Sequence, residues 1–371
     1  MTQRAEADVV RLSRRDVVMR LLAMGAGVGM SSLSGDADDL LAAALQTRSG
    51  AAPTFPQGAI IRTILKDLAP EALASRVTLF HEHLSINLPP LPGAPPLPPP
   101  VTYDVDLIVR EVKTAEQEGV GCIVDGGQPE MGRDMATLRR VANETGVHVV
   151  ASGGHYMPRT YPPGIATKSE DQIADDLVAD AARDRLGAFG EIGQAAGGAA
   201  MTPDERKVFR AVGKAHVRTG LPVFTHNAYG TGPDVKPDAG LVQLDVLESV
   251  GARPRNIVIG HACCLDDPTA AVLKKIAQRG AFVGIDRVTG GRVTDDKKIR
   301  ALVALLDAGY VDNVLLSSDY VGIRSAERPG YGNAVTVFVP LMRKAGIRPE
   351  LIHQMLYDNP RRFLAFVPKR A

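Results

Sequence analysis

Six residues of metal-ligand type stand out because each lies where a short apolar run ends. They are four of the eight histidines and two carboxylates: His81, His83, Glu191, His226, His261 and Asp319. Imidazoles and carboxylates are common zinc ligands, and a catalytic zinc site keeps one position open for water. A single histidine at such a place is more often structural, but six ligand-type residues at equivalent places predict a metal centre.

The spacing and chemistry of these residues suggest individual roles. His81 and His83 are two residues apart in an extended run, so their side chains point to the same side. Two divalent metals roughly 3.5–4 Å apart can share a hydroxide that attacks near neutral pH. Glu191 has one oxygen for each metal and is the predicted bridge. Asp319 can bind one metal and accept the proton as the hydroxide attacks, so it is the predicted catalytic residue. We expect two zinc ions, with manganese or cobalt as alternatives.

The elements that must position these residues follow from the pattern of apolar runs. Eight β-rich runs alternate with helical patterns, at residues 77–82, 120–125, 147–152, 187–191, 221–225, 256–260, 281–285 and 313–318. The runs are almost continuously apolar, which is typical of parallel strands covered on both faces. Eight such units predict an α/β fold, a (β/α)₈ TIM barrel with its active site at the carboxyl ends of the strands. The alternative is an open doubly wound sheet, but no glycine-rich fingerprint follows the first run.

Two of the expected helices carry clear start signals. Ser169 with Gln172 and Thr202 with Glu205 have the spacing of capping boxes. After the second box, small and branched residues recur at helical spacing: Val208, Ala211, Val212 and Ala215. This stripe is predicted to face the sheet.

The first fifty residues differ from the rest. Arg14 and Arg15 precede a weakly apolar stretch, residues 17–30, and then small residues. This order predicts a twin-arginine-type signal peptide and linker at residues 1–50, with a single hydrolase domain at 51–371. The implied partner is the twin-arginine translocase and the implied location is periplasmic or secreted. The alternative is an amphipathic helix that stays on the protein.

Composition narrows the remaining function classes. The 371 residues include 43 basic and 42 acidic side chains, which leave a net charge of +1. A chain with so little net charge lacks the excess of basic residues that nucleic-acid binding requires, so we expect no nucleic acid as a partner. The three cysteines, Cys122, Cys263 and Cys264, form no disulfide framework and suit folding in a reducing compartment. A homodimer is compatible with the sequence.

Several segments together resemble one known family. Residues 77–84, 123–125 with 132–134, 225–227, 260–261, 317–319 and 359–363 are similar, in order, to motifs of the phosphotriesterase family of the amidohydrolase superfamily. The resemblance implies one metal at His81, His83 and Asp319, and a second at His226 and His261. Well-known members bridge the metals with a carbamylated lysine, whereas Glu191 occupies that place here. In this the chain resembles the glutamate-bridged branch, the phosphotriesterase homology proteins.

Candidate substrate contacts follow the third and seventh strands. His155 and Tyr156 come after the third strand. Arg287 follows the seventh, as an arginine does in the related lactonases, and can hold a substrate oxygen or pair with a carboxylate. We expect Arg133 and Asp134 to form a structural ion pair, and Cys263 and Cys264 to be packing residues.

Three functions remain for such a barrel. The first is hydrolysis of a small carboxylic ester, lactone or organophosphate ester by a metal-bridging hydroxide. The second is a metal-dependent phosphodiesterase or nuclease, because a related barrel family of DNases has the same order of ligands. The near-neutral charge favours the first. The third is a non-catalytic binding protein, against which the intact ligand set argues. Loops 286–296 and 320–333 are expected to choose the substrate.

Overall fold

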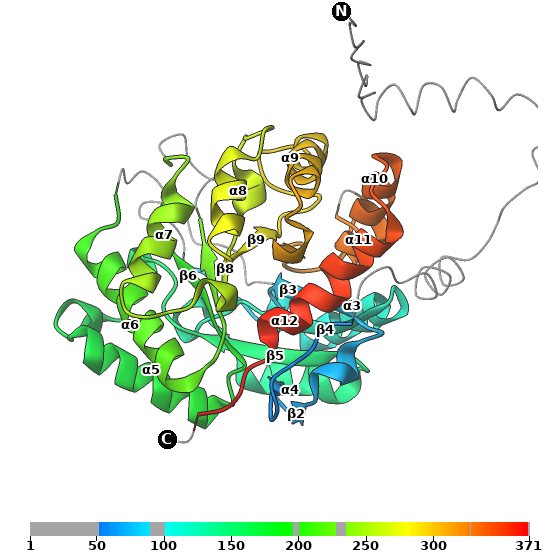
Figure 1. The fold of residues 1–371 in the computed structure, drawn as a ribbon. Coiled ribbons are helices and arrows are strands. Elements are labelled where there is room, and N and C mark those ends of the chain that lie inside the picture. The colour runs from blue at the N-terminus through cyan, green and yellow to red at the C-terminus, as the bar shows by residue number, and fades with distance from the viewer. Residues whose placement is uncertain (1–51, 90–100, 196–199, 228–234, 327, 370–371) are drawn as a thin grey trace, which may run out of the picture. The chain divides into compact units, whose positions relative to one another are not determined.

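The computed structural model describes residues 52–89, 101–195, 200–227, 235–326 and 328–369 (Figure 1). Residues Arg48–Ala371 belong to one compact unit. The predicted signal peptide at residues 1–50 lies outside the described residues, so export stays a prediction. Within the described ranges, no helix combines the length and the apolar character needed to cross a membrane.

Eight parallel strands form the barrel expected from the sequence. They are β3 (Val77–Glu82), β4 (Val120–Asp125), β5 (His148–Gly153), β6 (Ala188–Gly193), β7 (Val223–His226), β8 (Ile257–Ile259), β9 (Phe282–Ile285) and β10 (Val314–Leu316). Each strand pairs with the next along the chain, and a parallel bridge between His83 and Val321 joins the first strand to the last. The (β/α)₈ barrel is therefore confirmed, and the alternative of an open doubly wound sheet is wrong.

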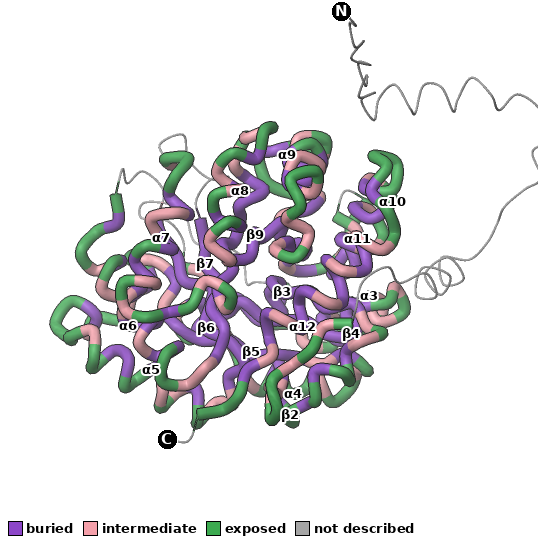
Figure 2. The backbone as a smooth tube through the Cα atoms, viewed as in Figure 1, coloured by how far each residue is buried: buried purple, intermediate pink, exposed green. Residues whose placement is uncertain are grey.

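Helices follow every strand and surround the barrel (Figure 1). They are α3 (Val105–Gln117), α4 (Met135–Glu144), α5 (Glu170–Asp184), α6 (Pro203–Thr219), α7 (Ala239–Glu248), α8 (Ala271–Gln278) and α9 (Asp295–Asp307), with α10 (Val339–Lys344), α11 (Pro349–His353) and α12 (Asn359–Leu364) after β10. The strands are buried, whereas the outer surfaces of the helices are exposed (Figure 2). Burial on both faces explains why the strand sequences are apolar throughout.

Both predicted capping boxes are present. Ser169 accepts a hydrogen bond from the Gln172 N–H at 3.2 Å, and Gln172 accepts one from the Ser169 N–H at 2.9 Å. Thr202 and Glu205 make the same exchange at 3.2 and 2.7 Å. These bonds satisfy amide groups that have no partner within the helix. The stripe on α6 is fully buried, as expected for a face turned to the sheet.

The chain before and after the barrel closes its amino end, a feature that the apolar runs did not predict. A short antiparallel hairpin, β1 (Ile61–Arg62) with β2 (Asp67–Leu68), precedes the first barrel strand. Ile60 forms an antiparallel bridge with Phe366. Helix α12 contacts β1 and the turn before β8, and its Phe363 packs in the barrel core. The carboxyl end of the barrel is left for polar residues.

Candidate metal centre

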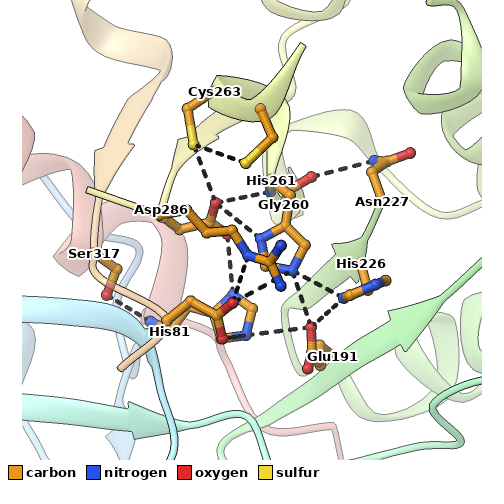
Figure 3. Close-up of polar contacts among 12 residues, drawn as sticks. His81, Glu191, His226, Asn227, Gly260, His261, Cys263, Asp286 and Ser317 are labelled. Atoms are coloured by element: carbon orange, nitrogen blue, oxygen red, sulfur yellow. Dashed lines mark hydrogen bonds and ion pairs between the residues drawn. The ribbon is translucent and has the colours of Figure 1, made fainter. Parts of the chain in front are cut away.

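The structure brings all six predicted ligand residues together at the carboxyl end of the barrel, and Figure 3 labels His81, Glu191, His226 and His261 among them. We call them the ligand cluster: His81, His83, Glu191, His226, His261 and Asp319. Their ligand atoms fall into two groups that share Glu191, and within each group they lie within 4.8 Å of one another. Asp319 is half-buried and the other five are buried.

Glu191 lies between the two groups of the ligand cluster. Its Oε1 atom is 3.4 Å from His83 Nε2, and its Oε2 atom is 2.8 Å from His226 Nδ1 and 3.4 Å from His261 Nε2. Asp319 Oδ1 approaches His83 Nε2 at 3.1 Å. Oε1 of Glu191 therefore faces His83, whereas Oε2 faces His226, His261 and also His81 at 3.3 Å, so the carboxylate lies between the two groups.

The backbone of β6 is irregular where it presents Glu191. The pairing of β6 with β7 shifts register between Phe189 and Ile192, and such irregularities redirect side chains near active sites. Gly190 has a φ of +148°, and a Cβ atom there would lie 2.3 Å from the ring of Phe224. Only glycine fits at this position, so Gly190 belongs to the means by which Glu191 is placed.

Asp286, directly after β9, is a functional candidate that the sequence analysis missed. Its Oδ2 accepts a hydrogen bond from His81 Nδ1 at 3.0 Å, and its Oδ1 is 3.2 Å from His261 Nδ1 (Figure 3). A carboxylate that holds the outer nitrogen of a histidine fixes the ring and leaves the other nitrogen for a metal. Asp286 is a carboxylate at a strand end, like Glu191, so the rule that found the cluster could also have found it.

Two members of the ligand cluster have unusual backbone conformations. His261 and Asp319 have φ angles of 53° and 49°, in the left-handed region. Each such residue costs about 1–3 kcal/mol and persists only where the surroundings hold it. Asp286 accepts the His261 N–H at 2.8 Å, and buried Glu82 accepts the N–H groups of both neighbours of Asp319 at 2.7 and 2.8 Å. Two buried carboxylates thus hold both strained turns.

The electrostatics of the ligand cluster favour bound cations. Burial acts to lower the pKa of both His83 and His261. The carboxylates of Asp319 and Glu191 nevertheless raise the pKa of His83 to about 9. The carboxylate of Asp286 raises the pKa of His261 to about 9 as well. Burial acts to raise the pKa of Glu191, but the neighbouring histidines hold it well below its usual range. Glu191 therefore stays ionised although it is buried, and its negative charge attracts cations to the ligand cluster.

An unpaired atom shows that the ligand cluster fits a divalent metal. His81 Nε2, which faces the cluster, is buried and has no hydrogen-bond partner among the described residues. His81 Nε2 is only 3.3 Å from Glu191 Oε2, yet without the geometry of a hydrogen bond. Buried polar atoms normally have partners, and imidazole nitrogens beside carboxylate oxygens are a typical zinc donor set.

The three predicted substrate contacts lie at different places. The hydroxyl of buried Tyr156 is 3.4 Å from His226 Nδ1, so it faces the ligand cluster. Arg287 Nε donates to Asp319 Oδ2 at 2.7 Å, which is the carboxylate pairing that the sequence allowed. His155 pairs with Glu130 at 3.2 Å, and no contact with the cluster is found for it in the described part of the chain.

The expected ion pair between Arg133 and Asp134 is wrong. The Asp134 carboxylate caps α4 by accepting the Ala136 N–H at 2.9 Å, whereas Arg133 pairs with Asp184 at 3.3 Å and bonds the carbonyl of Ser152. The free amides at the helix start compete successfully for the aspartate. Cys263 and Cys264 are buried as expected, in the turn after His261.

A (β/α)₈ barrel with histidines and carboxylates converging at its carboxyl end is the architecture of the metal-dependent amidohydrolases. Residues 63–364 match the model of the phosphotriesterase family. The chain is 32% identical over 299 residues to the phosphotriesterase homology protein of Escherichia coli, covering 77% of this chain and 97% of that protein. The chain belongs to the phosphotriesterase family, and it is a hydrolase of that family, as predicted.

Further relatives support this membership. The aryldialkylphosphatase of Saccharolobus solfataricus is 30% identical over 309 residues, covering 78% of this chain and 94% of that protein. The N-acetyltaurine hydrolase of Mus musculus is 26% identical over 359 residues, covering 82% and 98%. The crystal structure of the Escherichia coli protein, with phosphate in its active site, matches with a TM-score of 0.68 at 30% identity, over 78% of this chain and 99% of that one. The alternative of a nuclease gains no support from these relatives.

Proposed function

We propose that this protein is a binuclear metal-dependent hydrolase of a small carboxylic ester, lactone or organophosphate ester, with zinc as the expected metal. The observation that carries the proposal is the position of Glu191 in both groups of the ligand cluster, with Oε1 beside His83 and Oε2 beside His226, His261 and His81. One metal would be held by His81, His83 and Asp319, and the other by His226 and His261. When bound, two such metals polarise the bond to be cleaved and lower the pKa of water enough for attack near neutral pH.

The residues around the ligand cluster would then orient the reactants and move the proton. Asp319 is ionised, because the Arg287 guanidinium holds the pKa of that carboxyl well below its usual range, although burial acts in the opposite direction. Its Oδ1 faces the interior of the site, so it can take the proton from the attacking water and pass it to the leaving group. Arg287 keeps the other oxygen of Asp319 in place.

Tyr156 is suited to hold the oxygen of the substrate. Burial, with added repulsion from Glu191 and Asp319, raises its pKa well above the ordinary value. The phenol therefore keeps its proton at neutral pH and can donate a hydrogen bond to a carbonyl or phosphoryl oxygen beside His226. This donor would not discriminate strongly between a carboxylic ester, an organophosphate ester and the amide class represented by the N-acetyltaurine hydrolases.

Metal content and turnover test the proposal together. Protein expressed with added zinc or manganese should hold close to two metals per chain by elemental analysis, and it should hydrolyse members of a panel of aryl esters, lactones, phosphotriesters and N-acyl amides. Glu191→Gln should lose at least one metal and nearly all hydrolysis while the circular dichroism spectrum is retained, because a neutral amide offsets the repulsion between two cations far less well. Glu111→Gln is the matched control, since it removes a buried carboxylate that pairs with Arg324 at 2.9 Å, outside the cluster.

Each part of the proposal can fail separately. A wild-type protein with one metal or none after supplemented expression would refute the binuclear site. A Glu191→Gln variant with two metals and near-normal turnover would refute the bridge. A folded, metal-loaded wild-type protein that cleaves no compound of the panel would refute the hydrolase.

A further inference from the structure

A cavity of about 360 Å³ adjoins Asp319, between the loop after β9 and the loop after β10. We call it the rim cavity. The side chains that matter in its wall are Arg287, Ser318, Asp319, Tyr320, Arg328 and Asn333. Its wall includes Arg287 and Asp319 of the site described above, so a molecule held at the ligand cluster could extend into it.

Two buried polar groups in the wall of the rim cavity are unpaired. Ser318 and Asn333 are 6% and 2% exposed. Ser318 Oγ and Asn333 Oδ1 have no hydrogen-bond partner among the described residues. A buried polar atom without a partner costs about 1–3 kcal/mol, so a ligand that pairs with these groups recovers that cost. A serine hydroxyl can donate, and an amide can be turned to present its N–H groups.

Two guanidinium groups give the rim cavity a positive charge. Arg287 uses its Nε for Asp319, and its two terminal nitrogens make no hydrogen bond with a described residue. The guanidinium carbon of Arg328 lies 4.8 Å from the centre of the Tyr320 ring, and no described carboxylate pairs with it. Stacking on an aromatic ring leaves the N–H edge of a guanidinium available for a ligand.

The Tyr320 ring, on which Arg328 stacks, is itself held in place by its neighbours. Tyr320 is 1% exposed, its ring packs edge-on against Tyr331 at 5.0 Å, and its hydroxyl donates to the Arg328 carbonyl at 3.4 Å. Asp319 is the single carboxylate among the described lining residues, and it is already bound by Arg287 and His83. The charge of Arg328 is therefore not neutralised within the wall.

We propose that the rim cavity is the subsite for a negatively charged end group of the substrate, a carboxylate, sulfonate or phosphate oxyanion some atoms away from the bond that is cleaved. Arg328 would bind two oxygens of that group with its planar fork. Arg287, which lines the cavity and is bound to Asp319, would supply further N–H donors, and Ser318 and Asn333 would complete the set. The inference rests on the proposed function, because it extends the substrate of the same site.

A pair of esters with the same leaving group tests the subsite. Metal-loaded protein should hydrolyse the 4-nitrophenyl monoester of adipic acid with a kcat/KM about 10–100-fold higher than 4-nitrophenyl hexanoate, as expected for charge-assisted hydrogen bonds. The two esters differ only in the terminal carboxylate. In Arg328→Gln this ratio should fall towards unity, mainly through a higher KM for the adipate ester.

Arg292→Gln is the matched control, because Arg292 is an exposed arginine of the loop after β9 that does not line the rim cavity. It removes the same charge from the same region and should keep the ratio. Equal loss in both variants would show a general effect of charge and overturn the subsite, as would equal turnover of the two esters by the wild-type protein.

A binding measurement separates the subsite from the hydrolase. Calorimetric titration of the metal-loaded protein with methanesulfonate, a poor metal ligand, should show binding that weakens about tenfold or more in Arg328→Gln. If the protein cleaves neither ester but binds methanesulfonate through Arg328, the proposed function fails and the anion site stands. If it cleaves both esters equally and Arg328→Gln changes neither binding nor KM, the subsite fails and the hydrolase stands.

Discussion

The two ends of the barrel are made from the same eight strands but have opposite chemistry. Towards the amino end, phenylalanine rings pack edge-on: Phe80 lies 6.4 Å from both Phe224 and Phe363, and Phe282 lies 5.9 Å from Phe363. At the carboxyl end, the next residue after Phe80 is His81, and imidazoles and carboxylates replace the rings (Figure 3). Stability and function are therefore concentrated at different ends.

The difference shows where the molecule tolerates unfavourable local structure. At the carboxyl end, His261 and Asp319 have left-handed backbone conformations, and several carboxylates are buried. Each of these features, taken alone, lowers the stability of the folded protein. At the apolar end, the rings of Phe80, Phe224 and Phe363 are fully buried. The burial of apolar side chains at this end offsets the free energy lost at the polar end. Substitutions at the apolar end should therefore change stability, and substitutions at the polar end should change activity.

Of the changes that leave the metals in place, Asp319→Asn should have the largest effect, a reduction of kcat by about 10²–10⁴, the range typical of losing a general base. Metal should be largely retained, because the histidines remain, and the melting temperature should change little. Steady-state kinetics, elemental analysis and thermal unfolding measure the three quantities. A variant with unchanged kcat would show that Asp319 does not transfer the proton.

The opposite pattern is expected for Phe363→Ala at the apolar end. Removing a fully buried ring should lower the free energy of unfolding by about 3–5 kcal/mol. The kcat of the protein that remains folded should stay within about twofold, because no atom of the ligand cluster is touched. Phe363→Leu is the milder control, with an expected loss below about 1.5 kcal/mol. A large loss of kcat at unchanged stability would mean that the two ends are not separable.

A smaller effect is expected for Asp286→Asn, which tests how the polar end is held. The amide keeps the shape but orients His81 and His261 less firmly, so metal affinity should fall about 10–100-fold. Competition with a chelator measures the affinity, and circular dichroism should show a retained fold. Asp296→Asn, on the exposed surface of α9, is the control. Equal affinity in both variants would show that the hydrogen bonds of Asp286 do not matter for metal binding.

Much of the barrel could be predicted because its signals are local. The apolar runs mark the strands within one to two residues at most ends, and the caps of α5 and α6 depend on residues three positions apart. The ligand cluster was predictable for a related reason. In a barrel of parallel strands all carboxyl ends meet, so residues at equivalent strand ends converge whatever their distance along the chain.

The one wrong prediction, the ion pair of Arg133 with Asp134, concerns residues that find partners elsewhere in the chain. Asp134 could be assigned to Arg133 only by proximity in sequence, whereas the folded chain offers the amides of α4 and brings Asp184 to the arginine. His155 follows a strand as Tyr156 does, yet it turns to Glu130 while Tyr156 faces His226. Neighbouring loop residues point in different directions, and only the surrounding packing selects which one reaches the site.

Residue types and their spacing thus determined the eight strands, the helix starts and the six ligand-type residues of this protein, because each depends on local periodicity or on a strand end. The tertiary structure alone decided that Asp286 serves two histidines, that Arg287 pairs with Asp319, and that Arg328 stacks on Tyr320 beside unpaired Ser318 and Asn333. These contacts join residues of different strands and loops. Their geometry depends on the closure of the barrel and on side-chain burial, which no short stretch of sequence specifies.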